Sequence, residues 1–409
     1  MPLKPVEQHL ADALGLVAPL APLDVPLLEA LDCVLAEDVV APGALPAFDG
    51  SAMDGYAVRV EDVAGASGSG PVVLPVVADL PAGAGEPLVL VPGTAARIMT
   101  GAPVPRGTGA VVPVEWTDAG VASVTITRAP RPGQHVRRAG EDVQPGEALL
   151  DAGARLTPRS LALLAATGRG RVRVHPRPRV VVLSTGSELV EPGRPVAHGQ
   201  VTDSNSTALT AAVQETGAVA YRVGIVDDDP QRLLQVLEDQ LVRADVVVTS
   251  GGVSAGAYDV VKEVLSRLGT VTFEKVAMQP GMPQGLGTIG DGTPIFTLPG
   301  NPVSAYVSFE VFVRPALRRV LGEPELHRPS VTAEVTEGWT SPAGKRQFVR
   351  AVLTSDAAGR PRVRPAGGHG SHLVADLAVA NALAVVAEDV AQVEPGDLVR
   401  CMVLERGRR

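Results

Sequence analysis

The segment TSGGVSAGAYD at residues 249–259 carries the polar groups that point most directly to chemistry. It separates a short apolar run from an amphipathic one, as a strand-to-helix turn does. Glycines that leave backbone amides bare at a helix start favour anions, and a carboxylate beside them, here Asp259, suggests an accompanying cation. The alternative is an ordinary turn whose glycines only relieve the backbone. The candidate anion-binding residues are Ser250, Gly251, Gly252 and Ser254.

Two other apolar runs end in polar segments of the same kind, VLSTGSELV and TLPGNPVSA. In an open parallel sheet, ligands bind beyond the carboxyl ends of the strands, so three such ends predict one cleft. The second segment alone is also ordinary helix-start sequence, with Asn301 as the cap and Pro302 as the first helical residue. The candidate binding residues that these segments add are Ser184, Thr185, Gly186, Glu188, Pro299, Gly300 and Asn301.

Three consecutive aspartates at 227–229 follow a further apolar run. With Glu188 and Asp259 they could hold one hard divalent ion, as sites that use Mg²⁺ with a phosphate commonly do. The alternative is that Asp229 caps the helix that begins at Pro230 and that its neighbours are merely solvated. We expect a Mg²⁺ site whose candidate ligands are Glu188, Asp259 and the aspartates at 227–229, Asp228 among them.

Other patterns in the chain carry less information. GLGTIG at 285–290 matches the Gly-x-Gly-x-x-Gly pattern of dinucleotide sites, but a turn and then a strand follow it, so we expect a loop without that function. His369 and His372 lie in a glycine-rich segment, where simple exposure is expected. The two cysteines, Cys33 and Cys401, are far apart, which argues against a disulfide framework or a thiolate zinc site.

The polar segments must be positioned by a sheet, and the hydrophobic periods of residues 178–321 predict one. Short β-branched runs alternate with amphipathic stretches, which is typical of a doubly wound, mostly parallel sheet. The expected strands are 179–184, 219–226, 245–249, 271–277 and 294–298. The expected helices are 206–215, 230–243, a helix from 259, and 302–321.

The parts of the sequence before and after this sheet differ from it in the spacing of their apolar residues. Residues 41–147 consist of short alternating runs with many prolines and Gly-rich turns, which predicts an all-β lobe. Within it, FDGSAMDGYAV (48–58) and RIMTGAPVP (97–105) stand out as polar loops, and their spacing leaves functional and structural interpretations open. From residue 329 onward, short strands suggest a small β-barrel. Further helices are expected at 6–16, 27–35 and 156–167.

Composition narrows the classes of function. The chain has 409 residues, of which 45% are hydrophobic, and a formal net charge of −9. Its length allows several domains, and its acidic balance argues against a nucleic-acid binder. The N-terminus lacks the apolar region of a signal peptide, and no uncharged stretch is long enough to span a membrane. We therefore expect a soluble cytoplasmic protein with neither nucleic acid nor membrane as a partner.

Eight segments, in order along nearly the whole chain, resemble those of the molybdopterin molybdenumtransferases, to which the terminal domain of gephyrin is similar. The resemblance implies insertion of molybdenum from molybdate into adenylylated molybdopterin, supported by Mg²⁺ and accompanied by release of AMP. The segments are SAMDGYAV, RIMTGAPVP, VRRAGEDV, STGSEL, DSN at 203–205, SGGVS, LPGNPVSA and GSH at 370–372.

The resemblance also assigns roles to single residues. It implies that Arg350 and Ser371 line the molybdate side of the pocket, and it adds Arg137 and Asp203 as substrate-binding candidates. The functional residues of the family fall here on Asp54, Thr100, Glu188, Asp228, Asp259 and Lys275.

At the level of architecture, the resemblance implies an elongated homodimer of four-domain chains, classed as multidomain α/β plus β. Each cleft is expected to combine the sheet domain of one subunit with lobes of its partner. Molybdopterin adenylyltransferase and molybdoenzymes are further possible partners. The expected domains are a linker or dimerisation domain (26–45 and 148–177), a β-rich lobe (46–147), an α/β molybdopterin-binding domain (1–25 and 178–328) and a C-terminal β-barrel (329–409).

One departure from the family concerns the oxyanion site. The family commonly has Lys-Pro-Gly-Lys-Pro where this chain has Gln279-Pro-Gly-Met282-Pro, so two cations are missing while Lys275 and Arg350 remain. The strength of molybdate binding, and the choice between molybdate and tungstate, are therefore open. Two rival functions also remain: a molybdopterin adenylyltransferase, and a non-catalytic molybdopterin-binding scaffold.

Overall fold

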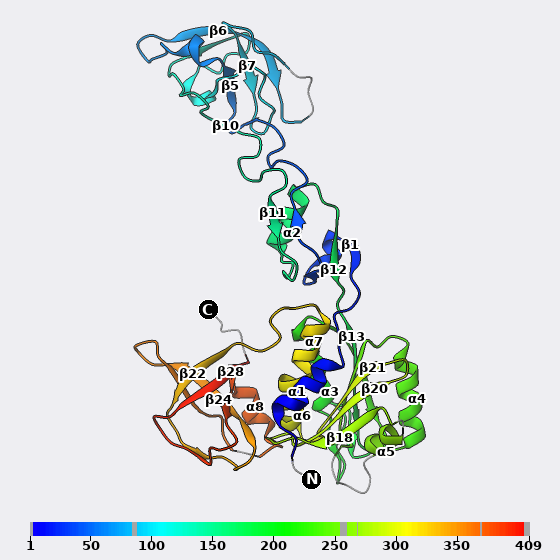
Figure 1. Ribbon diagram of the computed structural model, residues 1–409. Helices are drawn as coiled ribbons and strands as arrows, with labels where there is room; N and C mark the ends of the chain where they lie inside the picture. Colours follow the sequence, from blue (N-terminus) through cyan, green and yellow to red (C-terminus); the bar gives the residue numbers. More distant parts are fainter. Residues whose placement is uncertain (1–2, 84–87, 254–259, 268, 369, 405–409) are drawn as a thin grey trace.

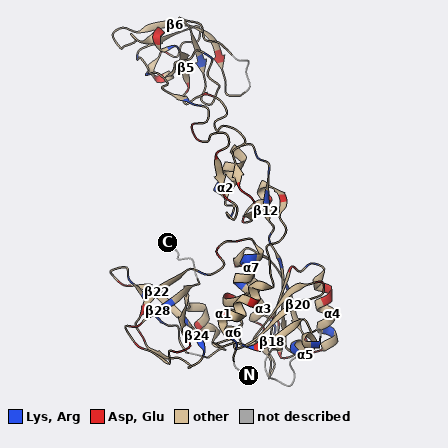
Figure 2. Cartoon of the chain, viewed as in Figure 1, with Lys and Arg blue, Asp and Glu red and all other residues tan. Residues whose placement is uncertain are grey.

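In the computed structural model, the described residues are 3–83, 88–253, 260–267, 269–368 and 370–404. The chain is elongated (Figure 1). A β lobe lies at one end, a narrow linker domain follows, and an α/β sheet domain lies beside a C-terminal barrel at the other end. The expected multidomain α/β plus β architecture is confirmed. Figure 2 shows acidic and basic residues spread over these parts rather than gathered in one of them.

A six-stranded sheet forms the centre of the sheet domain. Its first four strands are parallel, while β20 runs antiparallel to both of its neighbours. The strand order is β16 (Val219–Val226), β13 (Arg179–Thr185), β17 (Val246–Ser250), β21 (Thr293–Leu298), β20 (Pro283–Ile289) and β18 (Val271–Lys275).

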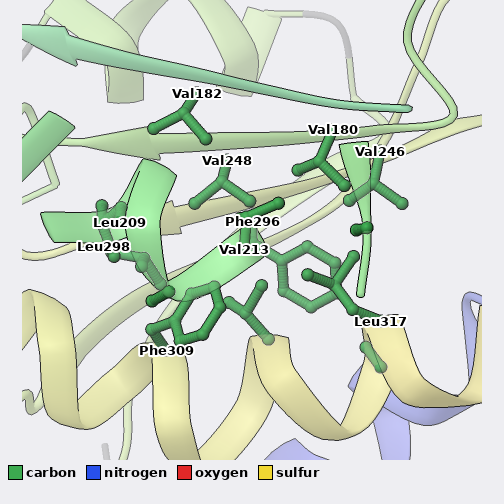
Figure 3. Close-up of a cluster of buried hydrophobic side chains, with 14 of the residues drawn as sticks. Val180, Val182, Leu209, Val213, Val246, Val248, Phe296, Leu298, Phe309 and Leu317 are labelled. Atoms are coloured by element: carbon green, nitrogen blue, oxygen red, sulfur yellow. The ribbon is translucent and has the colours of Figure 1, made fainter. Parts of the chain in front are cut away.

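Alternate side chains of these strands serve two separate cores, because successive residues of a strand point to opposite faces. Val180 and Val182 pack toward Phe309 and Leu317 on one face, as Figure 3 shows. Val181 packs on the other face with the helices α4 and α5. The first face is covered by α1 (Val6–Gly15), α3 (Asn205–Thr216), α6 (Pro302–Ser308) and α7 (Arg314–Val320), and the second by α4 (Pro230–Leu241) and α5 (Val260–Arg267).

Two expectations about local structure are wrong. GLGTIG belongs largely to strand β20 rather than to a loop. Its glycines serve packing, because a Cβ on Gly285 would lie 1.9 Å from the Thr297 hydroxyl and one on Gly287 would lie 2.1 Å from the Thr270 carbonyl. The helix expected at 27–35 is a 3₁₀ turn, Leu27–Ala30, followed by strand β2 (Val34–Leu35). Asp32 separates the two with a φ of 64°, a value that ends a helix.

The predicted helix at 302–321 is interrupted by a π-helical turn at Phe309–Val313, between α6 and α7. Glu310 in this turn is buried and accepts two 2.9 Å hydrogen bonds from Arg328, one from Nε and one from Nη2. Arg328 also donates to the Leu404 carbonyl at 2.7 Å. The bonds to Glu310 hold the Arg328 pKa above its ordinary value, although burial opposes the shift. This side chain therefore joins the end of the barrel to the helices of the sheet domain.

The β lobe is a five-stranded sheet, and β4 (Gly50–Ser51) and β10 (Val136–Arg137) form a separate two-stranded antiparallel sheet. Its buried strands consist of small and β-branched residues packed around Tyr56. The strand order is β8 (Ala110–Pro113), β5 (Gly55–Val58), β7 (Ala95–Ile98), β6 (Val72–Leu80) and β9 (Ser123–Ile126).

The linker domain has a small core around Leu35, Leu156 and Leu164. Helix α2 matches the expected helix at 156–167, and Gly168 follows it with a φ of +83°. Thr157 caps α2 in a capping box with Ser160. Its elements are β1 (Leu23–Pro26), β2, β3 (Val39–Val40), β11 (Ala148–Leu150), β12 (Arg171–His175) and α2 (Pro158–Ala166).

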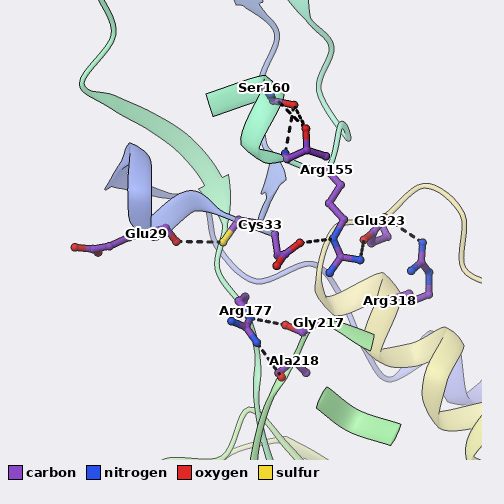
Figure 4. A network of polar contacts seen from close by, with 11 residues as sticks. Glu29, Cys33, Arg155, Ser160, Arg177, Gly217, Ala218, Arg318 and Glu323 are labelled. Atoms are coloured by element: carbon purple, nitrogen blue, oxygen red, sulfur yellow. Dashed lines mark hydrogen bonds and ion pairs between the residues drawn. The ribbon is translucent and has the colours of Figure 1, made fainter. Parts of the chain in front are cut away.

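A polar joint connects the linker domain to the sheet domain (Figure 4). Glu323, just after α7, pairs with Arg318 at 3.1 Å and with Arg155 of the linker domain at 3.3 Å. Arg177 Nε donates to the Gly217 carbonyl at 2.5 Å. Gly217 has a φ of +102°, a conformation that L side chains rarely adopt, and a Cβ there would lie 2.4 Å from Arg155 Nη2.

The C-terminal domain is a closed five-stranded barrel, since β24 pairs with both β25 and β26. Its core includes Trp339 and Cys401. Within the residues described, no helix is both long and apolar enough to cross a membrane. The barrel strands are β24 (Arg346–Ser355), β25 (Pro361–Pro365), β22 (Ser330–Val335), β28 (Leu398–Val403) and β26 (Ala382–Val386), with β19 (Met278–Gln279) added to β24.

Candidate active site

A cavity of about 920 Å³ opens at the carboxyl ends of β13, β17 and β21. This is the edge at which open parallel sheets bind ligands. Most of the binding residues expected in the sheet domain line it together. Those are Thr185, Gly186, Glu188, Asp203, Asp228, Ser250, Gly251, Gly252, Lys275, Pro299 and Asn301.

The turn after β17 requires its glycines. Gly251 and Gly252 have φ values of +95° and +66°. A Cβ on Gly251 would lie 2.5 Å from the Thr185 carbonyl, and one on Gly252 would lie 2.7 Å from the Val261 side chain. The adjacent Thr185 hydroxyl is buried and has no hydrogen-bond partner within the described part of the chain. Ser254 and Asp259, also expected here, lie outside the described residues.

Buried hydroxyls and an aspartate support the cavity floor. Ser184 Oγ lies 3.0 Å from Ser250 Oγ and donates to Asp203 Oδ1 at 3.0 Å. Asp203 also accepts bonds from the amide and hydroxyl of Ser206, and its carboxylate lies 3.6 Å from Arg222. Both Asp203 oxygens therefore have partners within the protein. Ser184 is buried and lies beneath the cavity rather than on its lining.

Two predicted metal ligands face the cavity with few partners of their own. Glu188 is exposed and lies over Gly186, where a Cβ would be 2.7 Å from its Oε2. Asp228 Oδ2 accepts one bond from the Ser187 amide at 2.9 Å. No group of three metal-ligating side chains occurs among the described residues, and the third expected ligand, Asp259, is not one of them. Asp229 caps α4, as the alternative interpretation of the triplet expected.

Lys275 supplies a positive charge to the cavity. It ends β18, its side chain is exposed, and it forms no ion pair with any residue that the structure describes. Met282, which replaces one of the lysines common in the family, also lines the cavity. Asn301 begins α6 without a side-chain cap bond. Asn205 holds the turn before it by donating to the Gly300 carbonyl at 2.7 Å.

The predicted barrel residues do not line the large cavity. Arg350 is buried, and it lines a separate water-sized cavity of about 20 Å³ together with Gln279. Desolvation by burial lowers the pKa of Arg350. The Ser371 carbonyl accepts a 3.0 Å bond from the Val303 amide at the start of α6. The next residue, His372, does line the large cavity, although only simple exposure was expected for it from its glycine-rich segment.

Asp54 and Thr100 lie together, but at the other end of the chain (Figure 1). Asp54 Oδ1 accepts bonds from the Thr100 amide at 2.7 Å and from its hydroxyl at 2.8 Å. These bonds, the amide foremost, hold the pKa of Asp54 below its ordinary value. Arg137 lies in β10 of the same lobe and is exposed. A single chain therefore does not bring the lobe residues to the cavity.

Comparison with known proteins gives matches over nearly the whole chain. Three family models match: the MoeA N-terminal region (domain I and II) at residues 4–168, a probable molybdopterin binding domain at 181–319, and the MoeA C-terminal region (domain IV) at 332–404. Molybdopterin molybdenumtransferase 2 of Mycobacterium tuberculosis is 50% identical, covering 96% of this chain and 98% of its own length. Molybdopterin molybdenumtransferase of Haemophilus influenzae is 36% identical and covers 91% of both chains.

A solved structure of a molybdopterin biosynthesis moeA protein from Pyrococcus horikoshii superposes with a TM-score of 0.81 at 32% identity, covering 98% of this chain and 99% of that one. Another structure, also of a molybdopterin biosynthesis moeA protein from Pyrococcus horikoshii, gives a TM-score of 0.73 at 29% identity, covering 98% of this chain and 100% of that one. The resemblance seen in the eight sequence segments is thus confirmed by family models, relatives and fold alike. The chain belongs to the molybdopterin molybdenumtransferase family, whose members are transferases of molybdenum cofactor biosynthesis.

Proposed function

We propose that this chain transfers molybdenum from molybdate into adenylylated molybdopterin and releases AMP. One observation carries the proposal: a cavity of about 920 Å³ at the carboxyl edge of a mostly parallel sheet combines the Gly251–Gly252 turn, two accessible carboxylates and a lysine that has no ion pair with the described residues. Backbone amides in such a turn suit a phosphate. The volume accommodates a pterin nucleotide, since ligand pockets commonly measure roughly 300–1,000 Å³.

The lining residues of the cavity have separate proposed roles in binding the two substrates. The amides of the turn and the unpartnered Thr185 hydroxyl bind the phosphates of the adenylylated pterin. Lys275, the sole lysine or arginine among the described lining residues, attracts the molybdate oxyanion. Release of AMP is the hydrolysis of a phosphoanhydride bond: a water oxygen forms the new bond to phosphorus as the bridging P–O bond breaks, and charge that develops on the leaving phosphate is stabilised by groups already oriented toward it.

The donor set also suits Mg²⁺. Glu188 and Asp228 present carboxylate oxygens to the cavity without an ion pair to the described residues, and hard divalent cations prefer such ligands. We propose that both hold Mg²⁺, with Asp259 as a third ligand. When bound, the ion would neutralise negative charge on the phosphates.

We further propose a homodimer with active sites shared between subunits. Asp54 and Thr100 are exposed but lie at the opposite end of the chain from the cavity, so a partner subunit has to bring them to it (Figure 1). The small linker domain also exposes large apolar side chains, which is typical of a contact surface. These are Leu23, Leu28, Leu31 and Val40, with Leu28 at 87% exposure.

We also propose that the chain is divided into the four domains expected from its sequence. Helix α1 packs on the face of the sheet domain that α3 and α7 cover, which supports joining residues 1–25 to 178–328. The other proposed domains are 26–45 with 148–177, 46–147, and 329–409. We propose a cytoplasmic location, with molybdopterin adenylyltransferase and molybdoenzymes as partners.

The function is tested by measuring AMP release from adenylylated molybdopterin with and without molybdate. Release that requires both molybdate and Mg²⁺ is the expected result. If incubation with Mg-ATP and free molybdopterin instead gives the adenylylated pterin, the chain is an adenylyltransferase. Tight pterin binding without either reaction would favour a scaffold.

A further inference from the structure

The cavity has one wall that the sheet domain does not supply. Almost all of its described lining residues lie between Thr185 and Ser304. His372 and Val374 come instead from a segment of the barrel domain, 370–374, which leads into helix α8 (Val374–Val379) and which we name the barrel loop. Of these two side chains, only the imidazole of His372 can form a hydrogen bond with a ligand.

The barrel loop is fixed on both sides. Arg350, buried in β24, donates from Nη1 to the Leu373 carbonyl at 2.8 Å and from Nη2 to the Gly368 carbonyl. On the other side, the Ser371 carbonyl accepts the 3.0 Å bond from the Val303 amide of α6. Arg350 thus contacts the loop and not the large cavity.

The ring of His372 lies over its neighbour Gly370. A Cβ on Gly370 would lie 2.9 Å from Cε1 of the ring, so the absence of a side chain at Gly370 leaves room for the imidazole in this position. The ring forms no hydrogen bond or ion pair with the residues that the structure describes, and His372 is exposed at the cavity. An imidazole that has no partner among the described residues and that faces an anion-binding cavity is available to donate a hydrogen bond to the ligand.

We infer that His372 donates a hydrogen bond to an anionic oxygen of the bound substrate, and that Arg350 acts as a positioning residue for it. The inference rests on the proposed function and extends it to a residue of the barrel domain. The oxygen belongs either to the phosphate of the adenylylated pterin or to molybdate. Both present the same chemistry to an imidazole N–H, and kinetics can separate them.

The test compares His372→Ala with the wild-type full-length protein in the AMP-release assay. Molybdate is varied at saturating adenylylated molybdopterin, and the pterin is then varied at saturating molybdate. The KM for one of the two should rise about tenfold, the usual cost of losing one hydrogen bond to a charged group. Exposed His198, which is outside the cavity lining, provides the control His198→Ala.

Which KM rises identifies the oxygen. Unchanged KM values for both substrates in His372→Ala would overturn the inference, whereas absence of AMP release from the wild-type protein would count against the proposed function instead.

The positioning role is tested by a double-mutant cycle. Arg350→Met should raise the same KM as His372→Ala, and the double variant should cost little more than either change alone. Additive effects would mean that Arg350 acts independently of His372 and would overturn the positioning role. Arg364→Met, a change of an exposed arginine on neighbouring β25, is the control for general effects on the barrel. If Arg350→Met fails to fold, Arg350→Lys replaces it in the cycle.

Discussion

At the residue scale, the candidate site is defined by positions where one residue type alone fits. Gly251 and Gly252 stand out in a local sequence pattern, and their positive φ values and close contacts in the structure give the reason. Other residues could not be assigned from the sequence. Ser184 was expected on the cavity surface but lies beneath it, and His372 was considered merely exposed. The contacts that decide these roles come from residues distant in sequence.

Gly251→Ala should abolish most AMP release. The added Cβ meets the Thr185 carbonyl in a left-handed conformation, so the turn must shift and its amides lose their alignment. Gly292→Ala is the matched control, because Gly292 has a φ of +100° but no atom within 4 Å of an added Cβ. Both changes carry a conformational cost of about 1–2 kcal/mol in the free energy of unfolding. Equal activity of the two variants would remove the turn from the mechanism.

At the scale of elements, hydrophobic period was the reliable guide. The long Val-rich strands and amphipathic helices of 178–321 were predicted nearly as they occur, because buried parallel strands are continuous apolar runs. The short segments were harder. Residues 27–35 have helical spacing, yet a left-handed Asp32 and pairing of β2 with β12 divide them. Strand β20 was missed because its glycines, which close packing requires, resemble those of a loop.

Helix α1 should make the protein sensitive to acid through His9. This residue is buried against Phe312, and burial, with a smaller effect from Lys4, lowers its pKa to about 4. Because the unfolded chain binds the proton more readily, the stability that neutral His9 contributes to the folded protein is present above pH 6.5 and is lost as the pH falls toward 4. Between pH 7 and pH 5, the free energy of unfolding of the wild-type protein should drop by about 2 kcal/mol more than that of His9→Leu.

Urea denaturation at the two pH values measures this difference, with His198→Leu as the control for an exposed histidine. If the wild-type protein and His9→Leu lose the same stability between pH 7 and 5, His9 is not the origin of the acid sensitivity.

At the scale of the whole molecule, the feature that matters most for the proposed function is the separation of the β lobe from the cavity. The length of the chain and the changes in its hydrophobic pattern indicated several domains, but a sequence pattern does not specify the angle at which domains meet. That angle depends on a few contacts at the joint of Figure 4, where Arg155 and Glu323 are 3.3 Å apart. A shared active site requires this angle to be held, because the lobe of one subunit has to reach the cavity of the other.

Arg155→Met should loosen the joint. Distances between spin labels at Ser69→Cys in the lobe and Ser266→Cys in the sheet domain should spread over a wider range, and the KM for the adenylylated pterin should rise. Glu323 would then keep only Arg318 as an ion-pair partner among the described residues. Arg159→Met, a change of an exposed residue on α2, is the control. A distance distribution identical to that of the wild-type protein would show that other contacts fix the lobe.

Complementation between inactive chains tests the shared active site most directly. Asp54→Ala removes a lobe residue and Lys275→Ala removes a cavity residue, so each homodimer should release little AMP. When equal amounts of the two chains are mixed and exchange subunits, half of the dimers become heterodimers. One of the two sites in each heterodimer combines an intact lobe with an intact cavity. We therefore predict recovery of about a quarter of wild-type activity, as two-fold symmetry requires. A mixture that stays inactive, although exchange into heterodimers is demonstrated, would contradict the shared site.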